Sequence, residues 1–139
     1  MTTSLPTVAL VYDLDGTLAP GNMQEFGLLQ ALGYDTPADF WNLCDQIAKT
    51  NDAGGIAVVM YAIQAEAERA GIHCSREFLR SYGSHVQFFR GVEQWFSLIN
   101  EYAAQIGVEV KHYINSSGIK EMIEGCSIAK EFEQIGRAH

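Results

Sequence analysis

Residues 8–18 read VALVYDLDGTL, and this stretch decides the fold that the sequence predicts. Its first five residues are apolar and rich in types that favour β-strands, and the run ends abruptly at Asp13. A continuous apolar run of this length is typical of a strand buried on both faces of a parallel sheet. The sequence therefore predicts an α/β protein in which a polar loop containing Asp13 and Asp15 follows the first strand.

Residues 19–88 carry helical patterns and no convincing strand. Thr36-Pro37 and Ser75 are typical helix starts, and Gly33 and Gly71 are typical helix stops. We therefore expect an all-α insert at residues 19–88, which divides the core into residues 1–18 and 89–139. The helices expected within the insert cover residues 23–32, a segment from Pro37 through Ile47, residues 56–70, and a short segment from Ser75 through Tyr82.

The chain returns to an α/β pattern after the insert. In the second predicted strand His112 shares one face with Ile114, so we expect a packed structural histidine rather than a catalytic one. Only two strands are predicted in the whole chain. The elements expected after the insert are a helix at 93–106, a strand at 108–114, and helices at 119–124 and 128–135.

The composition excludes several classes of protein. Lys and Arg number 9 and Asp and Glu number 17, and the resulting formal charge of −8 argues against nucleic acid and anionic membrane surfaces as partners. The longest apolar run, residues 56–63, is far shorter than the roughly 20 residues that span a bilayer. Residues 1–7 contain no Lys or Arg, so no secretory signal is expected. Cys44, Cys74 and Cys126 form no CxxC pair, which predicts reduced thiols in a cytoplasmic protein.

A polar cluster follows each of the two predicted strands. Asp13 and Asp15 follow the first strand, and Ser116 and Ser117 follow the second. Ligands of open α/β sheets bind at the carboxyl ends of strands, so we expect these side chains to meet at one edge of the sheet. Two carboxylates one residue apart fit three uses: binding Mg²⁺, acting as nucleophile and acid/base, or forming a solvated turn. The Asp-x-Asp-Gly-Thr pattern is rarer than a lone Asp-Gly turn, which favours a functional use.

The stretch at residues 8–18 resembles motif I of the haloacid dehalogenase-like (HAD) hydrolase superfamily. INSSG at residues 114–118 is similar to motif II of that family, and FFRGV at residues 88–92 resembles the segment that returns its chain from cap to core. The resemblance implies a Rossmannoid parallel sheet, here a truncated core, with an inserted helical-bundle cap of the C1 type. Phosphatases of the family keep the second Asp and dehalogenases lack it, so Asp15 implies a phosphatase-type member that acts on a small phosphorylated metabolite.

The resemblance also implies a role for each matching residue. Asp13 would be the nucleophile that forms an aspartyl-phosphate, and Asp15 would be the general acid/base. Mg²⁺ would be held by the Asp13 carboxylate and the Asp15 backbone carbonyl. The phosphate would be bound by the turn at Gly16 and Thr17 and by a serine hydroxyl, Ser116 in preference to Ser117. Candidate substrate contacts from the cap, each also typical of an ordinary helix residue, are Gln24, Glu25, Trp41, Asn42 and Asp45.

Two later motifs of the family have no counterpart after Gly118. Lys120 and Lys130 are the only lysines there, and neither is followed by a strand ending in an acidic pair. The strand at residues 8–12 would then be an open edge of the sheet. Three interpretations follow: the N-terminal part of a phosphohydrolase, a non-catalytic HAD-scaffold binding module or pseudo-enzyme that forms a homo-oligomer through this edge, or a phosphorelay receiver domain. The helical insert argues strongly against the receiver domain, and we favour the phosphohydrolase.

Overall fold

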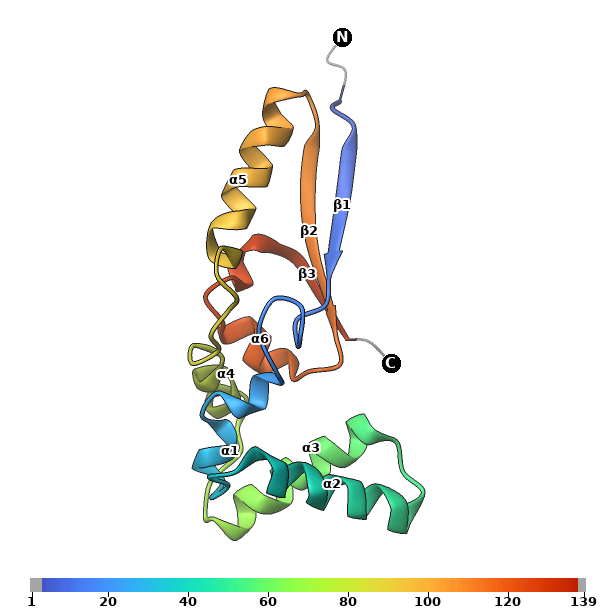
Figure 1. The fold of residues 1–139 in the computed structure, drawn as a ribbon, viewed down its shortest axis with the longest axis vertical. Coiled ribbons are helices and arrows are strands. Elements are labelled where there is room, and N and C mark those ends of the chain that lie inside the picture. The colour runs from blue at the N-terminus through green and yellow to red at the C-terminus, as the bar shows by residue number, and fades with distance from the viewer. Residues whose placement is uncertain (1–3, 138–139) are drawn as a thin grey trace.

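The computed structural model describes residues 4–137, which form a three-stranded parallel sheet with helices on one face and a helical pair beyond one end (Figure 1). The strand order is β1-β2-β3, and the predicted α/β fold class is confirmed. No helix in this part of the chain is long and apolar enough to cross a membrane. The strands are β1 (Thr7–Tyr12), β2 (Glu109–Ser116) and β3 (Phe132–Arg137), and the α-helices are α1 (Leu28–Ala31), α2 (Pro37–Asn51), α3 (Gly55–Arg69), α4 (Arg76–Gly83), α5 (Val92–Gln105) and α6 (Lys120–Gly125).

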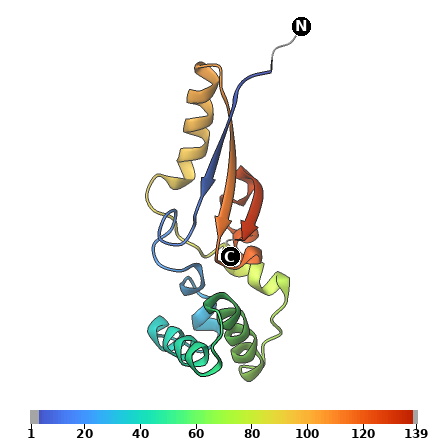
Figure 2. The same ribbon diagram turned by 90° about the vertical axis from the view of Figure 1, so that its right-hand side faces the viewer.

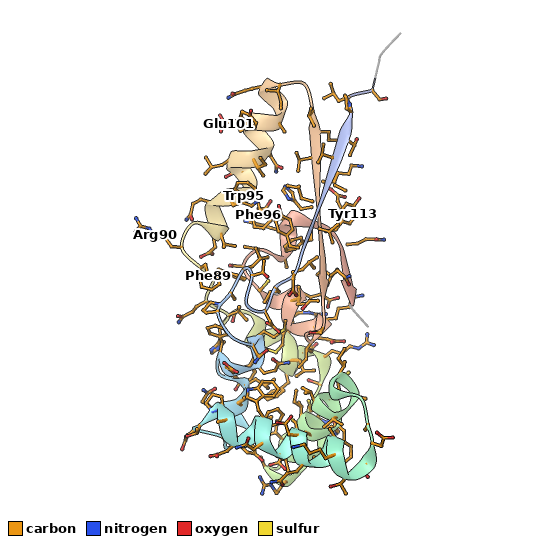
Figure 3. All side chains as sticks on the ribbon, turned by 45° about the vertical axis from the view of Figure 1, so that its right-hand side comes forward. Phe89, Arg90, Trp95, Phe96, Glu101 and Tyr113 are labelled. Carbon is orange, nitrogen blue, oxygen red and sulfur yellow. The ribbon has the colours of Figure 1, made fainter. Side chains whose placement is uncertain are left out.

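The strand β1 lies at one edge of the sheet, and the prediction that it is buried on both faces is wrong. Its one neighbour among the described strands is β2, with Tyr12 opposite Ile114. The side chain of Val11 is 65% exposed, because none of the described helices covers its face of the sheet (Figure 2). Figure 3 shows the contrast between the two faces: Phe96 of α5 lies against the sheet, whereas Tyr113 of β2 points from the uncovered side. A continuous apolar run such as that of β1 therefore does not by itself show that a parallel strand lies in the middle of the sheet.

The prediction of a helix at residues 128–135 is also wrong, because the second half of that segment belongs to a third strand. A short 3-10 helix covers Ala129–Glu131, and β3 then pairs in parallel with the free edge of β2. The pairing register shifts between His112 and Tyr113, which leaves Glu133 without a partner of its own in the register. This irregularity lets Phe132 and Ile135 both pack against the core although they are three residues apart, a spacing that is typical of a helix.

The helix expected at residues 23–32 is interrupted. A 3-10 helix covers Met23–Glu25, and α1 begins only at Leu28. Between them Gly27 has a φ of +110°, and a Cβ placed on it would lie 3.3 Å from both Tyr82 and His85. The close approach of the end of α4 therefore requires a glycine in a left-handed conformation, and this packing overrides the local helical spacing.

The other helix predictions are confirmed to within a few residues. Pro37 occupies the first turn of α2, and the Ser75 hydroxyl caps α4 by accepting a hydrogen bond of 3.0 Å from the Phe78 N–H. His112 is buried on the α5 side of the sheet, as predicted for a structural histidine. Its Nδ1 lies 2.8 Å from the Tyr12 hydroxyl and its Nε2 lies 2.7 Å from Oδ1 of Asn100, so both ring nitrogens have partners.

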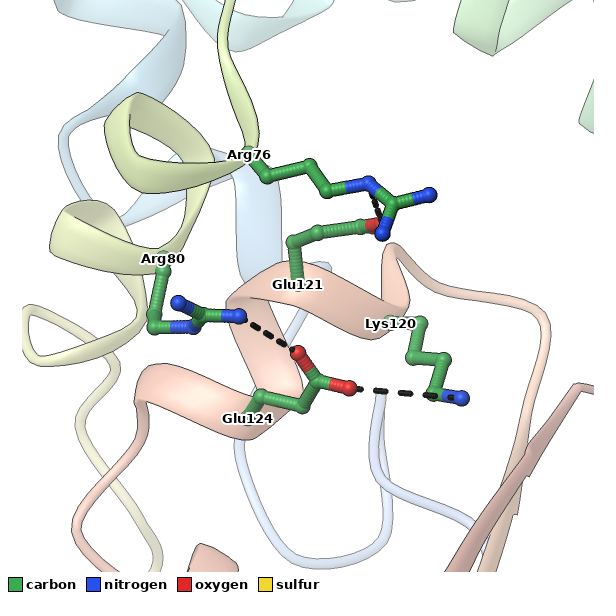
Figure 4. A network of polar contacts seen from close by, with 5 residues as sticks. All are labelled: Arg76, Arg80, Lys120, Glu121 and Glu124. Carbon is green, nitrogen blue, oxygen red and sulfur yellow. Dashed lines mark hydrogen bonds and ion pairs between the residues drawn. The ribbon is translucent and has the colours of Figure 1, made fainter.

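Helix α4, which the sequence places in the insert, packs against α6 of the core. Arg80 pairs with Glu124 at 3.1 Å and Arg76 pairs with Glu121 at 3.8 Å across this contact (Figure 4). Beneath the ion pairs the two helices meet at Gly83, where an added Cβ would fall on the backbone of α6. The contact ties the end of the insert to the helix that follows Ser117, while the domain boundary at residue 88 stays a prediction.

Candidate functional site

The loop after β1 is a tight turn built around the carbonyl group of Leu14. That oxygen accepts hydrogen bonds from the backbone N–H groups of Thr17, Leu18 and Ala19, at 3.1, 2.9 and 3.2 Å. Gly16 has a φ of +75°, and its N–H donates to the carbonyl of Ala19 at 2.7 Å. The N–H groups of Gly16 and Thr17 are thus engaged inside the turn, and their part in phosphate binding stays a prediction.

The two carboxylates of the loop lie in different environments on either side of the buried Leu14. Asp13 is exposed, and its Oδ1 accepts a hydrogen bond of 2.8 Å from the Leu14 N–H. Asp15 is half-buried, and its Oδ1 accepts a hydrogen bond of 2.9 Å from the Met23 N–H. These bonds orient both side chains from the backbone, as a nucleophile and an acid/base group require.

Burial raises the pKa of Asp15 to about 6, against the opposing effect of the Met23 hydrogen bond. The negative charges of Asp13 and Glu25 raise this pKa as well. A carboxyl group with a pKa near 6 is partly protonated close to neutral pH, and it can therefore donate a proton in one step and accept one in the next.

The raised pKa predicts how stability depends on pH in metal-free protein. The pKa of Asp15 is higher in the folded protein than in the unfolded chain, so the folded protein binds this proton more tightly. The contribution of the protonated Asp15 side chain to the free energy of unfolding is therefore complete below about pH 4 and is lost as the pH rises through about 6. Asp15→Asn keeps an oxygen for the Met23 N–H and removes the buried charge. We expect it to raise the free energy of unfolding at pH 8, relative to the wild type, by on the order of 1–2 kcal/mol after solvent screening, with little gain at pH 4.

Urea unfolding at the two pH values, in the presence of a chelator, measures this difference. Asp35→Asn, which changes an exposed carboxylate, is the control and should give no gain that depends on pH. An equal effect of Asp15→Asn at pH 4 and pH 8 would contradict the proposed burial of charge.

The two serines predicted to bind phosphate are placed differently at the end of β2. Since β1 and β2 are parallel and in register, their carboxyl ends lie side by side at the same end of the sheet, as predicted. Ser116 is buried, and its Oγ accepts a hydrogen bond of 3.0 Å from the Gly118 N–H. Ser117 is exposed and borders a cavity together with Asp15. The sequence favours Ser116 for phosphate binding, whereas the structure brings Ser117 to the cavity.

This cavity has a volume of about 250 Å³ and lies between the carboxyl edge of the sheet and the helices α2 and α3. Gln24, one of the candidate contacts, is buried beside it, and its Oε1 has no hydrogen-bond partner among the described residues. Glu25, Asn42 and Asp45 do not line the cavity. The residues that border it from the segment 19–88 include Asn22, Gln24, Trp41, Ile56 and Val59, of which only Gln24 and Trp41 were candidates from the sequence.

The donors available for a metal ion are few. Within residues 4–137 no group of three or more His, Cys, Asp and Glu side chains could hold a metal. Mg²⁺ is commonly bound by one or two carboxylates, with water and substrate phosphate completing its six ligands. Asp13 and Asp15 fit that minimal set, so the loop is compatible with Mg²⁺ that is held jointly with a phosphate.

Comparison with known proteins gives likenesses to solved structures. No family model matches the sequence, and no curated protein matches it. The fold is similar to that of the L-2-haloacid dehalogenase RSc1362, with 15% sequence identity and a TM-score of 0.44. The match covers 97% of this chain and 64% of that one, so the chain spans less than two thirds of the dehalogenase's length. The activity and substrate of this chain therefore have to be argued from its own residues.

Proposed function

We propose that the chain is a HAD-like hydrolase of the cytoplasm that catalyses Mg²⁺-dependent phosphoryl transfer from a small phosphomonoester. The observation that carries the proposal is the DLDGT turn at the carboxyl end of β1, which orients an exposed Asp13 beside a half-buried Asp15 with a pKa of about 6. A nucleophile exposed to the substrate and an acid/base group of raised pKa are the two groups that such a transfer needs.

The proposed reaction has two steps. An oxygen of Asp13 attacks phosphorus, and the bond from phosphorus to the alcohol oxygen breaks while protonated Asp15 donates its proton to the leaving alcohol. Ionised Asp15 then takes a proton from the water that attacks the aspartyl-phosphate, which releases inorganic phosphate and restores both carboxyl groups. Mg²⁺, held by the Asp13 carboxylate and the Asp15 carbonyl, would neutralise the charge of the phosphate.

The cavity supports a substrate with a small alcohol portion. Its volume of about 250 Å³ and its apolar side chains, including Trp41 and Val59, suit a compact carbon skeleton. The unpartnered Oε1 of Gln24 would gain a hydrogen bond from a hydroxyl or amino group on that skeleton. We therefore expect the substrate to be a small phosphorylated metabolite with a hydrogen-bond donor away from the phosphate.

Release of inorganic phosphate from 4-nitrophenyl phosphate and from glycerol phosphate tests the proposal. We expect release in the presence of Mg²⁺, its loss with a chelator, and its return when Mg²⁺ is added in excess. Equal release with and without Mg²⁺ would contradict the proposed mechanism.

A second candidate, a non-catalytic binding module, is favoured because no group of three or more His, Cys, Asp and Glu side chains in the described residues could hold a metal ion. It predicts binding of inorganic phosphate that depends on Mg²⁺, measured by calorimetry, without release from either ester. Release of phosphate from the esters would thus support the hydrolase, whereas Mg²⁺-dependent binding of phosphate without release would support the binding module.

A further inference from the structure

Glu25 lies beside the candidate site without bordering the cavity, and the catalytic proposal gives its side chain no role. It is half-buried at the end of the 3-10 helix Met23–Glu25. Its Oε1 accepts a hydrogen bond of 2.8 Å from the Trp41 Nε1–H and one of 3.1 Å from the side-chain amide of Asn22. Trp41 and Asn22 both border the cavity, so Glu25 lies behind the cavity wall and binds two of its members.

These two hydrogen bonds join two separate elements. Asn22 directly precedes the 3-10 helix, whereas Trp41 lies near the start of α2, 16 residues after Glu25. The other carboxylate oxygen, Oε2, fills the space beside Gly21, where an added Cβ would lie 2.7 Å from it. Hydrogen bonds to an ionised acceptor are shorter and stronger than neutral ones. The Glu25 carboxylate therefore fixes the start of α2 against the segment that follows the DLDGT turn.

The same 3-10 helix orients the proposed acid/base group. The N–H of Met23, two residues before Glu25, donates to Oδ1 of Asp15 at 2.9 Å. Asp15 and Trp41 both border the cavity. The 3-10 helix thus connects the acid/base group to the apolar wall, and the Glu25 carboxylate sets the distance between them.

The position of the Trp41 ring depends on a partner for its N–H group. The ring is half-buried and packs edge-to-face on Phe40, with ring centroids 5.2 Å apart. A partly buried N–H that loses its acceptor is costly, because it has given up its hydration for that bond. Without the Glu25 carboxylate, the Trp41 side chain would therefore turn toward water and leave the wall.

We propose that Glu25 is a positioning residue of the candidate site: it holds Trp41 and Asn22 in place as the wall against which the alcohol portion of a phosphomonoester binds. The identity of that ligand rests on the proposed function, whereas the hold on Trp41 does not. Glu25 itself touches neither the substrate nor the metal ion. Its role depends on the reach and the acceptor of its side chain, so Glu25→Gln should preserve it, and Glu25→Asp, which is one methylene shorter, should not.

The fluorescence of Trp41 tests this hold without substrate or Mg²⁺. The chain has two tryptophans, so a Trp95→Phe background leaves Trp41 as the only one. In this background we expect Glu25→Ala and Glu25→Asp to shift the emission to longer wavelength and to raise the acrylamide quenching constant by about 2-fold or more. Glu25→Gln should change neither. Circular dichroism verifies the fold of each variant.

Glu68→Ala is the matched control for the fluorescence measurement. Glu68 is exposed on α3 and accepts a hydrogen bond of 3.2 Å from the Gln64 side-chain amide, but it does not border the cavity. Its removal should leave the emission and the quenching of Trp41 unchanged. Quenching that Glu25→Ala and Glu25→Asp leave unchanged would overturn the proposal, and an equal change with Glu68→Ala would overturn it as well.

Binding of two phosphonates with Mg²⁺, measured by calorimetry, tests whether the wall that Glu25 holds receives the alcohol portion. Propylphosphonate has a longer carbon chain than methylphosphonate, and neither has an ester bond to hydrolyse. We expect Glu25→Ala to raise the dissociation constant of propylphosphonate by about 10-fold, because its apolar contact with the wall is lost, and to change that of methylphosphonate little. Glu25→Gln should bind both as the wild type does.

An equal loss of affinity for both phosphonates, or no loss, would overturn the proposal, and so would a wild type that binds neither of them. Esters that release no phosphate would contradict the catalytic proposal alone, because the fluorescence and the phosphonate binding need no turnover. The two proposals therefore fail separately.

Discussion

Asp13→Asn is expected to lower the rate of Mg²⁺-dependent phosphate release by at least about 10³-fold, because a carboxamide cannot form the acyl-phosphate bond. The amide oxygen can still accept the hydrogen bond from the Leu14 N–H that orients the carboxylate in the wild type. The turn around the Leu14 carbonyl is made by backbone groups and does not involve the Asp13 side chain. We therefore expect the loss of activity without a loss of folding, measured by phosphate release and circular dichroism on the same samples.

Asp15→Asn is the informative comparison, since it leaves the nucleophile in place and removes the acid. The first step, measured as the initial burst of alcohol release, should slow little with 4-nitrophenyl phosphate, whose leaving group needs no proton, and by about 10²-fold or more with glycerol phosphate. The second step, in which Asp15 takes a proton from water, should slow equally with both esters. Asp35→Asn should match the wild type with both esters. If Asp13→Asn kept the wild-type rate, or if Asp15→Asn slowed the first step by the same factor with both esters, the assigned roles would be wrong.

The sequence predicts the elements whose apolar pattern is local and uninterrupted. The strand β1, the strand β2 and the helix starts at Pro37 and Ser75 all depend on neighbouring residues, and the structure places them within a few residues of the prediction. The sequence predicts a helix over residues 128–135, where the structure has β3, and Phe132 and Ile135 have a spacing of three residues that also occurs on one side of a helix. They share a face only because the register shifts at His112, and this shift belongs to the pairing of two segments that are distant in sequence.

The candidate site was predictable to a similar extent. Asp13 and Asp15 are identified by one contiguous motif, and the structure confirms their place at the carboxyl end of β1. The cavity residues Ile56 and Val59 carry no local signal, because they border the site only through the packing of α3 over the loop. The contrast between Ser116 and Ser117 likewise depends on the hydrogen bond to the Gly118 N–H, which follows from the shape of the turn rather than from the residue types.

Gly83→Ala is expected to destabilise the fold by about 2–3 kcal/mol, roughly a hundredfold in the unfolding equilibrium. An added Cβ would overlap the carbonyl oxygen of Met122 and would lie 2.8 Å from the carbonyl carbon of Gly125. These are backbone atoms of α6, so no side-chain rotation relieves the overlap and one of the two helices has to move. Urea unfolding followed by circular dichroism measures the change.

The same experiment separates close packing from charge as the force that holds α4 on α6. Arg80 and Glu124 form an ion pair at 3.1 Å, but both side chains are partly exposed to solvent, and such pairs contribute about 0–1 kcal/mol. Arg80→Ala should therefore cost less than Gly83→Ala, and Gly55→Ala, where an added Cβ meets nothing within 4 Å, should cost nothing. A larger loss for Arg80→Ala than for Gly83→Ala would show that the ion pairs dominate. Because α6 directly follows Ser117 and Gly118, a helix displaced by Gly83→Ala should also shift the cavity wall and reduce phosphate release, whereas Arg80→Ala should leave it unchanged.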